Sequence, residues 1–284
     1  MSKRRQRNKV PYIKPVPTKA ISSTLVDIIT PVYGRFDLLK RCLESIPAAA
    51  KDISYHIILI DNNSPNKEEA DVFYNEIKIQ KNIRVVRNKE NLGFPKACNQ
   101  AVRLSHSPLL FFLNSDVILF EDAIKNLVLA MDDPNNGAVG MKLLFPPDTE
   151  SGPDGKVQHI GLYTNINGAF DHLFIGWSPD NPKVKAVNEV LAVTGAAFMT
   201  RRALYTQLGG FDEVYGGGTY EDVDYCLRLR LSGKTILIEQ KAVGYHYTGA
   251  SARTYQVGFP LNQNKALFDA RWGGKYPWTA WLHA

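Results

Sequence analysis

The segment Pro108–Phe120 (PLLFFLNSDVILF) limits the fold more than any other stretch of the sequence. Leu109–Leu113 are apolar without alternation, which is the pattern of a strand buried on both faces of a parallel sheet. A polar tripeptide, Asn114–Asp116, follows it directly. Because ligands of open α/β sheets bind at the carboxyl ends of strands, and buried polar groups need partners, this tripeptide predicts a binding site. The alternative is that Asp116 only caps a helix that begins near Glu121.

The first half of the chain repeats this order of a strand followed by a helix. Expected strands are Leu25–Thr30, His56–Ile60 and Ile83–Arg87, and expected helices are Asp37–Ile46, Glu68–Ile77 and Phe94–Leu104. Pro31 and Pro47 are expected to end the first strand and the first helix. Strands that alternate with helices imply a mostly parallel, Rossmann-like sheet with right-handed crossovers, so the fold class is α/β.

The second half is less regular. Strands are expected at Gly137–Leu144, Val190–Val193 and Lys234–Ile238, and helices at Asp122–Met131 and Arg201–Leu208. Residues 145–182 are rich in Pro, Gly, Asp and Asn and are interpreted as loop and lid, with Val157–Tyr163 as a candidate strand.

Charge separates the ends of the chain from its body. The net charge is +6, but seven basic residues precede the first acid, Asp27, and the other 27 basic residues face 28 acidic ones. The prolines of this basic stretch oppose helix, which predicts an extended arm at residues 1–24. Residues 25–254 would then form the α/β domain, with a nucleotide-binding half at 25–144 and a catalytic half at 145–254. Residues 255–284 form an aromatic C-terminal segment that includes Trp272, Tyr276, Trp278 and Trp281.

Localisation is predicted from what the sequence lacks. The basic arm has no apolar core of a signal peptide, and no run approaches the ~20 apolar residues that span a bilayer. Cys42, Cys98 and Cys226 are odd in number and widely spaced, which indicates buried thiols in a reducing compartment. A cytoplasmic protein is expected, with peripheral contact at the inner membrane face as an option.

A second chemical stretch is Phe211–Arg230 (FDEVYGGGTYEDVDYCLRLR). Three glycines precede a helix whose first turn carries Glu221, Asp222 and Asp224, where the helix dipole favours carboxylates. Val223, Leu227 and Leu231 recur every four residues and are expected to face the core, which leaves Glu221 and Asp222 at the mouth of the helix. The alternative is an ordinary charged first turn. His246 lies among aromatics in AVGYHYTGAS, where a structural histidine is the simpler interpretation.

Seven segments in order resemble a family 2 glycosyltransferase of GT-A fold, and together they cover residues 25–251. They are VDIITPVYGRFDLLKRCLES, LIDNNSP, NKENLGFPKACNQAV, FLNSD, TGAAFMTRR, GGFDEVYGGGTYEDVDYCLRLR and GYHYTGAS. The resemblance implies a nucleotide-sugar donor, a divalent cation (Mn²⁺ or Mg²⁺), and a glycan or lipid-linked glycan as acceptor.

The resemblance also implies roles for single residues. Pro31 and Tyr33 would border the nucleotide base, and Asp61 would accept hydrogen bonds from the base or ribose. Asp116 and His246 would bind the metal, Asp222 would be the general base, and Glu221 would contact sugar or acceptor. The other donor contacts would come from Asn91, Gly93, Lys96, Asn114, Ser115, Gly195 and Ala196.

Asn114 departs from the family pattern, which has aspartate at this first position of its Asp-X-Asp motif. Asparagine can hydrogen-bond a ribose hydroxyl but brings no charge, so a metal site would rest on Asp116, His246 and the diphosphate. In the family, an Asn-X-Asp variant hints at deoxysugar donors such as rhamnose.

The chemistry is consistent with these roles. A divalent cation neutralises the charge of a leaving diphosphate, and one carboxylate can deprotonate the acceptor hydroxyl. One base and no enzyme nucleophile predict a single displacement with inversion, unlike glycosidases with their two flanking carboxylates.

Three other functions are compatible with parts of the sequence. A nucleotidyltransferase would need a basic glycine-rich loop after the first strand, and Tyr33-Gly34-Arg35 is too short for it. A non-catalytic nucleotide-sugar-binding module would lack the base or the metal ligand. A transferase that acts on modified bases of viral DNA would use the basic arm for phosphate contacts, but the arm suits an anionic membrane surface equally well. A solvated arm and a packed C-terminal helix remain the simplest interpretation of the two ends.

Overall fold

The computed structural model of the protein describes residues 25–149, 152–164, 170–256 and 258–273. The expected basic arm at residues 1–24 lies outside these ranges, as do Tyr276, Trp278 and Trp281. Among the described residues, none of the helices combines the length and the hydropathy that a membrane span requires.

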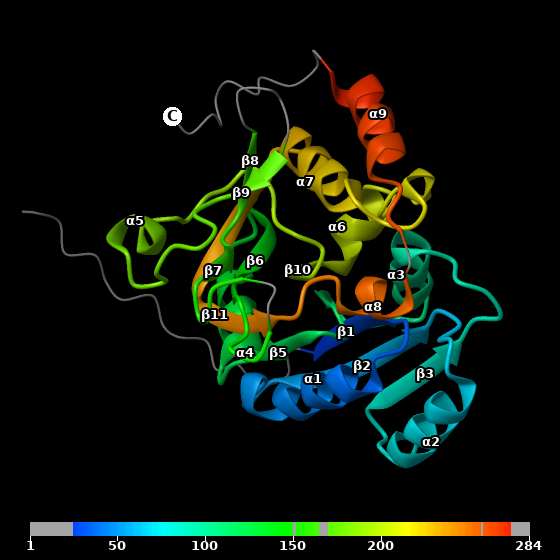
Figure 1. Cartoon of the computed structure of the whole chain (residues 1–284). Helices are drawn as coiled ribbons and strands as arrows, with labels where there is room; N and C mark the ends of the chain where they lie inside the picture. Colours follow the sequence, from blue (N-terminus) through cyan, green and yellow to red (C-terminus); the bar gives the residue numbers. More distant parts are fainter. Residues whose placement is uncertain (1–24, 150–151, 165–169, 257, 274–284) are drawn as a thin grey trace, which may run out of the picture.

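The strand and helix units expected in the first half are confirmed (Figure 1). The strands are β1 (Leu25–Val32), β2 (Ser54–Asp61), β3 (Ile83–Arg87) and β4 (Leu109–Leu113), and the helices between them are α1 (Phe36–Ala49), α2 (Lys67–Ile77) and α3 (Phe94–Arg103). These four strands are parallel and lie in the order β3-β2-β1-β4. Their carboxyl ends therefore meet at one edge of the sheet.

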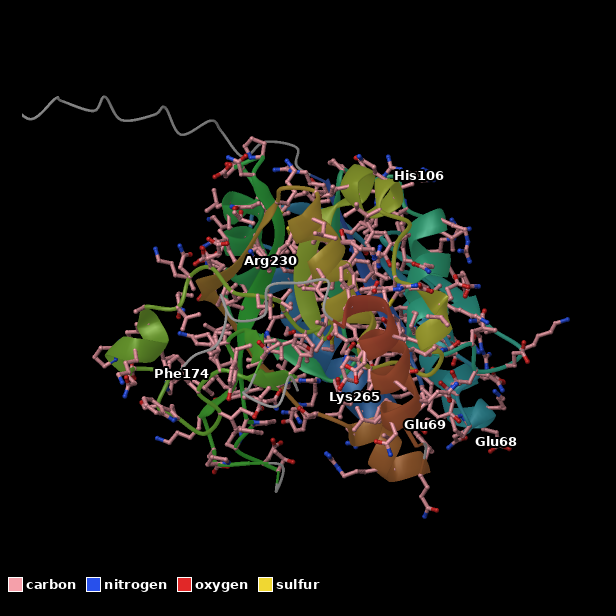
Figure 2. The ribbon with its side chains drawn as sticks, turned by 90° about the horizontal axis from the view of Figure 1, so that it is seen from above. Glu68, Glu69, His106, Phe174, Arg230 and Lys265 are labelled. Carbon is pink, nitrogen blue, oxygen red and sulfur yellow. The ribbon has the colours of Figure 1, made fainter. Side chains whose placement is uncertain are left out.

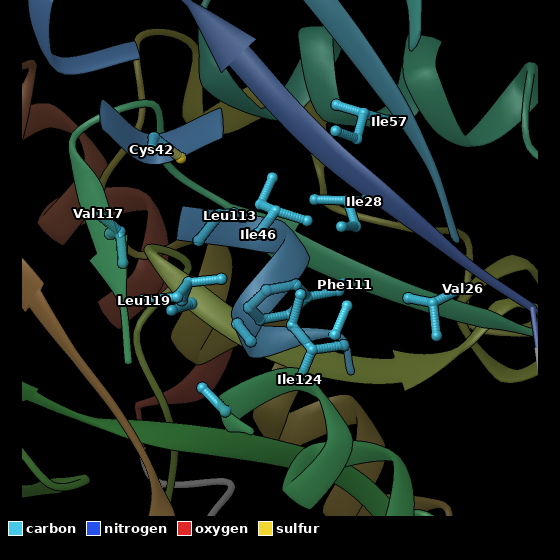
Figure 3. Packing of buried hydrophobic residues seen from close by; sticks show 14 of the residues in the cluster. Val26, Ile28, Cys42, Ile46, Ile57, Phe111, Leu113, Val117, Leu119 and Ile124 are labelled. Atoms are coloured by element: carbon cyan, nitrogen blue, oxygen red, sulfur yellow. The ribbon is translucent and has the colours of Figure 1, made fainter. Parts of the chain in front are cut away.

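Alternate residues of these strands enter two hydrophobic cores, one on each face of the sheet. Ile28 and Phe111 belong to the core beneath α1, α2 and α4, and Figure 3 shows both in one cluster with Ile46 of α1. Their neighbours Ile29 and Phe112 belong to the core beneath α3, α6 and α7. Burial on both faces explains why the sequence of β4 shows no alternation.

The second half extends the same sheet with strands of both directions. They are β5 (Val117–Leu119), β6 (Asn136–Leu144), β10 (Ala197–Arg201) and β11 (Thr235–His246), and α4 (Ala123–Ala130) lies between β5 and β6. The order continues from β4 as β10-β6-β11-β5, with β10 antiparallel to β4 and β6 and the end of β11 antiparallel to β5. The sheet is therefore mixed but mostly parallel, as expected, because β6 and β11 pair in parallel and run in the same direction as β4.

Shorter elements surround this sheet. They are β7 (Val157–His159), β8 (Leu162–Thr164), β9 (Phe170–His172), α5 (Pro182–Lys185), α6 (Arg202–Gln207), the 3-10 helix η1 (Glu213–Tyr215), α7 (Glu221–Leu231), α8 (Ala250–Tyr255) and α9 (Leu261–Trp272). In Figure 1, α9 and α5 lie on opposite sides of the molecule.

The strand expected at Val190–Val193 is wrong. Glu189 and Ala192 form only isolated bridges, and the strand begins after Gly195, at Ala197. The apolar run is nevertheless buried. Its carbonyl groups find partners there, because the Arg230 guanidinium donates hydrogen bonds to the carbonyl oxygens of Val190 and Leu191. The distance from Arg230 Nε to the Leu191 oxygen is 3.0 Å. A side chain thus satisfies backbone groups that a sheet would otherwise pair.

Four smaller expectations are also corrected. Pro31 does not end β1. The pairing of β1 with β4 stops at Ile29, so the edge of Pro31 that faces β4 has no strand partner and the missing N–H of the proline is tolerated. Pro47 lies inside α1, near its end. Leu231 is 67% exposed because it is the last residue of α7. Asp116 does not cap a helix, since β5 intervenes and Asp122 is the N-cap of α4.

Candidate active site

A cavity of about 560 Å³ lies at the carboxyl edge of β1 and β4. Seven residues expected to bind donor or metal line it: Pro31, Tyr33, Asn91, Gly93, Asn114, Ser115 and Asp116. Gly216 and Gly217 form part of its wall, as do residues near α8 and Phe259 before α9. Among the described lining residues, Asp116 has the only charged side chain.

Gly195 and Ala196 connect this cavity to the start of α7. The Asn114 N–H donates to the carbonyl oxygen of Ala196 at 2.8 Å. The Gly195 N–H donates to Oδ2 of Asp222, also at 2.8 Å. A Cβ built on Gly195 would lie 3.3 Å from the cavity-lining Phe94 and 3.5 Å from Cβ of Asp222. Glycine at position 195 therefore lets Asp222 lie close behind the cavity wall.

Asp116 and His246 meet although they lie far apart in the sequence. The end of β11 pairs with β5 so that His246 is opposite Val117, the residue after Asp116. His246 Nε2 lies 3.4 Å from Asp116 Oδ1, and both side chains are largely buried.

Gln158 fixes the ring orientation and the tautomer of His246. Its amide donates to the carbonyl oxygen of His246 at 2.8 Å, which turns its Oε1 toward His246 Nδ1 at 2.7 Å. Nδ1 then carries the proton in the neutral ring, and the lone pair of Nε2 faces the Asp116 carboxylate. Two electron-pair donors this close repel unless a cation or proton lies between them. Histidine and carboxylate are suitable first ligands for Mn²⁺, so the donor set fits a divalent cation.

No third His, Cys, Asp or Glu side chain joins this pair within the described part of the chain. Any further ligands would have to be oxygens of a bound diphosphate or water.

Glu221 and Asp222 differ in their surroundings at the start of α7. Asp222 is partly exposed and accepts hydrogen bonds from the N–H groups of Gly195 and Val223. Burial nevertheless raises its pKa. Glu221 is 5% exposed and its Oε2 has no hydrogen-bond partner. Burial, and then the charge of Asp222, raise the pKa of Glu221 well above its ordinary value. Glu221 therefore holds a proton most readily, and Asp222 holds the negative charge.

Replacing Glu221 with glutamine should remove a pH-dependent loss of stability. Because the pKa of Glu221 is higher in the folded state, the unfolded chain ionises first as pH rises past about 4.5, and folding free energy is lost until the folded pKa is passed. The thermal midpoint of Glu221→Gln should therefore exceed that of the wild type by a margin that grows from pH 4 to pH 8. A margin that is constant with pH would contradict this assignment.

The wall formed by Gly93 depends on the absence of a side chain. Gly93 has φ +81°, and a Cβ built on it would lie 2.1 Å from the carbonyl oxygen of Gly216. Any larger residue would push apart the N-terminus of α3 and the glycine loop, which is defined as residues 216–218. Two segments more than 120 residues apart therefore share one cavity wall.

A model of the family described as glycosyl transferase family 2 matches residues 27–207. The chain belongs to this family. The chain is 30% identical over 239 residues to the O-antigen biosynthesis protein RfbC of Myxococcus xanthus, a match that covers 80% of this chain and 18% of that protein. It spans a quarter or less of the length of two curated relatives that match 80% of it.

Solved structures confirm the predicted GT-A fold. GalNAc-T7 with UDP, GalNAc and Mn²⁺ aligns with a TM-score of 0.68 at 14% identity, over 89% of this chain and 49% of that chain. Staphylococcus aureus TarS 1–349 in complex with UDP-GlcNAc aligns with a TM-score of 0.53 at 17% identity, over 78% and 58%.

Two residues predicted to bind the donor lie away from the cavity wall. Asp61 is buried, and its carboxylate accepts from the N–H and Oγ of Ser64 and from Nε of Arg87. Ser64 Oγ in turn accepts from the N–H of Gly34, so Asp61 supports the loop after β1 rather than lining the cavity. Lys96 is exposed on α3 and is not among the lining residues.

At the base end of the cavity, Tyr255 of α8 covers the loop after β1. Its ring meets that of Tyr33 edge-on at 5.6 Å, and its hydroxyl accepts from the N–H of Arg35 at 3.3 Å. A Cβ on Gly34 would lie 2.2 Å from this hydroxyl. Helix α8 thus closes one side of the site predicted for the base.

Sequence reasoning missed two polar residues of the site. Asn62 lines the cavity, accepts from the N–H of Leu92 and donates to the carbonyl oxygen of Gly93, each at 3.1 Å. Its place in the strand-end run DNN was a signal for it. Gln158 lies in a short strand of the variable second half, and nothing local in the sequence indicates its contact with His246.

Proposed function

We propose that the protein transfers a sugar from a UDP- or dTDP-linked donor to an acceptor hydroxyl, with inversion at the anomeric carbon. The observation that carries the proposal is the Asp116–His246 pair beside the cavity, 3.4 Å apart with the lone pair of Nε2 turned toward the carboxylate. The fold neighbours crystallised with UDP, GalNAc and Mn²⁺, or with UDP-GlcNAc, support a nucleotide-sugar donor.

The nucleoside would bind at the end of the cavity nearest β1. Pro31 and Tyr33 offer apolar surface to the base, and Asn114 can hydrogen-bond a ribose hydroxyl. Asn91, Gly93 and Ser115 line the path toward the sugar. Asp61, buried beneath the loop, would contribute by holding Ser64 and Gly34 in place.

Asp116 and His246 would hold a divalent cation, Mn²⁺ or Mg²⁺. When bound, the cation supplies positive charge to the leaving diphosphate. The lack of Lys and Arg among the described residues that line the cavity supports this role for a cation.

Asp222 would be the general base. Glu221 keeps its proton because its carboxyl is buried without a partner, so the negative charge resides on Asp222, which the Gly195 N–H orients. Asp222 can take the proton from the acceptor hydroxyl as oxygen bonds to the anomeric carbon and the diphosphate leaves. A single carboxylate in this role supports inversion.

The acceptor is proposed to be a glycan or a lipid-linked glycan. The O-antigen biosynthesis relative supports polysaccharide assembly as the context.

Replacing Asp116 with alanine should make UDP binding independent of Mn²⁺. The variant keeps the apolar surface for the base but lacks the carboxylate that faces His246 Nε2. Isothermal titration calorimetry with UDP, with Mn²⁺ or with EDTA, measures the effect. The exposed Asp132→Ala variant is the control and should retain the Mn²⁺ dependence of the wild type. Mn²⁺-enhanced UDP binding by Asp116→Ala would refute the metal site.

A further inference from the structure

The segment 258–272 contributes to the cavity although the family match ends at residue 207. Phe259 lines the cavity and is 53% exposed. Solvent exposure of a large aromatic side chain at the mouth of a cavity is unfavourable unless a ligand covers it.

Asn264 of α9 forms hydrogen bonds with the backbone of the glycine loop and of the residue before it. Its side chain is buried, and Nδ2 donates to the carbonyl oxygens of Tyr215 and Gly218, both at 2.7 Å. Gly216 and Gly218 have φ +54° and +116°, a backbone that glycine allows. The loop therefore turns carbonyl oxygens toward a buried amide, while Gly216 and Gly217 line the cavity.

Helix α9 is itself firmly attached to the catalytic helix α7. The buried Asp224 carboxylate accepts from Nη1 of Arg271 at 2.9 Å and from Nε1 of Trp272 at 2.8 Å. Figure 2 shows Lys265, on the same helix, well separated from Phe174, which lies near α5. The C-terminal end of α9 is thus anchored to α7.

Phe259 is part of an apolar patch around the glycine loop. A Cβ built on Gly217 would lie 3.3 Å from Cδ of Pro260, so the two segments are in contact. Phe259 and Leu261, which flank Pro260, are 53% and 54% exposed, and Val214, three residues before Gly217, is 49% exposed. We define these three side chains as the apolar rim. The N–H groups of Gly216 and Gly218 bond to the carbonyl oxygens of Glu213 and Tyr215, and the Gly218 carbonyl oxygen accepts from Asn264, which leaves the backbone of the lining residue Gly217 for a ligand.

We propose that the apolar rim and the glycine loop form the acceptor subsite, and that it takes the pyranose ring of a neutral saccharide. This inference rests on the proposed glycosyl transfer. A pyranose has one face made largely of C–H groups, which packs on an aromatic ring, and hydroxyls at its edge that hydrogen-bond to backbone. Phe259 offers such a ring, and the lining residue Gly217 offers backbone groups beside it.

Other occupants fit the rim less well. An alkyl chain needs a longer continuous apolar surface than three side chains interrupted by glycines. An anionic polymer needs cationic side chains, and among the described lining residues the only charge is the negative one of Asp116.

Saturation-transfer NMR on the protein with UDP and Mn²⁺ tests the subsite. The probes are the methyl glycosides of glucose, galactose, N-acetylglucosamine and rhamnose. At least one should receive saturation on the ring protons of one face. Phe259→Ala should reduce that signal at least fivefold, and Phe259→Tyr, which keeps the ring, should restore most of it. Trp177→Ala removes an exposed aromatic that packs on Phe174, far from α9, and should match the wild type.

Calorimetry with UDP on the same samples separates the two proposals. If UDP binds but no glycoside is saturated, or if Phe259→Ala leaves the signal unchanged, the subsite is refuted and the transferase proposal stands. If neither UDP nor dTDP binds the wild type in the presence of Mn²⁺, the proposed function fails and the subsite falls with it.

The Asn264 clamp has its own matched control. Asn264→Ala should speed hydrogen exchange of amides 215–220 and weaken glycoside binding although Phe259 is intact, while UDP affinity stays within about twofold. Asn262→Ala, an exposed asparagine on the same helix, should change neither. Unchanged glycoside binding in Asn264→Ala would exclude the clamp as a positioning residue.

Discussion

Replacing Asp222 with asparagine should lower the rate of sugar transfer about a hundredfold or more and leave the affinity for UDP nearly unchanged. Asparagine keeps the shape of the side chain and an oxygen that can accept from the Gly195 N–H. It cannot take a proton from an acceptor hydroxyl. Because Asp222 lies behind the cavity wall and not among its lining residues, the nucleotide contacts should be preserved.

The measurement is UDP release from a panel of UDP-sugars, with an added glycoside as acceptor, together with UDP titration of each variant. Glu213→Gln is the control, since Glu213 is an exposed carboxylate in η1, eight residues before Glu221. NMR of the product should show an anomeric configuration opposite to that of the donor. Retention of configuration, or an Asp222→Asn enzyme as active as the control, would overturn the proposed mechanism.

The parallel half of the fold could be predicted because its signals are local. Leu109–Leu113 are buried on both faces, so their pattern does not depend on which elements cover them. Parallel strands end at a common edge of the sheet, which predicts that the polar residues after β1 and β4 share one site. Asp116, Asn114 and Tyr33 follow this rule.

Elements that depend on distant contacts could not be predicted from local patterns. His246 reaches Asp116 only because β11 continues past Ile238 and shifts register on β6 between Glu239 and Val243. Asp61 lies at the end of β2, as expected, but its carboxylate accepts hydrogen bonds from Ser64 and Arg87 and lies beneath the loop after β1. The Val190–Val193 run has strand-like composition, but its carbonyl oxygens bind the side chain of Arg230. In each case a side chain from another part of the sequence decides the outcome.

Asp224 joins α7 to residues far away in the sequence. Replacing it with alanine should lower the free energy of unfolding by about 3–5 kcal/mol, which is the cost of breaking a buried network of charged groups. Asp224 is fully buried and accepts from Nε of Arg228, Nη1 of Arg271 and Nε1 of Trp272, each within 2.9 Å. Without the carboxylate, the Trp272 N–H loses its partner and α9 loses its anchor on α7. The largely buried Arg228 guanidinium keeps the carbonyl oxygens of Leu208 and Gly210 but loses its counter-charge.

Urea unfolding measures this loss, and Asp269→Ala is the matched control on α9. Asp269 forms an exposed pair with Lys265 four residues earlier, at 2.6 Å, so its removal should cost no more than about 1 kcal/mol. Because Arg271 and Trp272 fix the end of α9, Asp224→Ala should also increase hydrogen exchange of the glycine loop, which Asn264 holds from the same helix. Equal stabilities of the two variants would show that α9 is not anchored through Asp224.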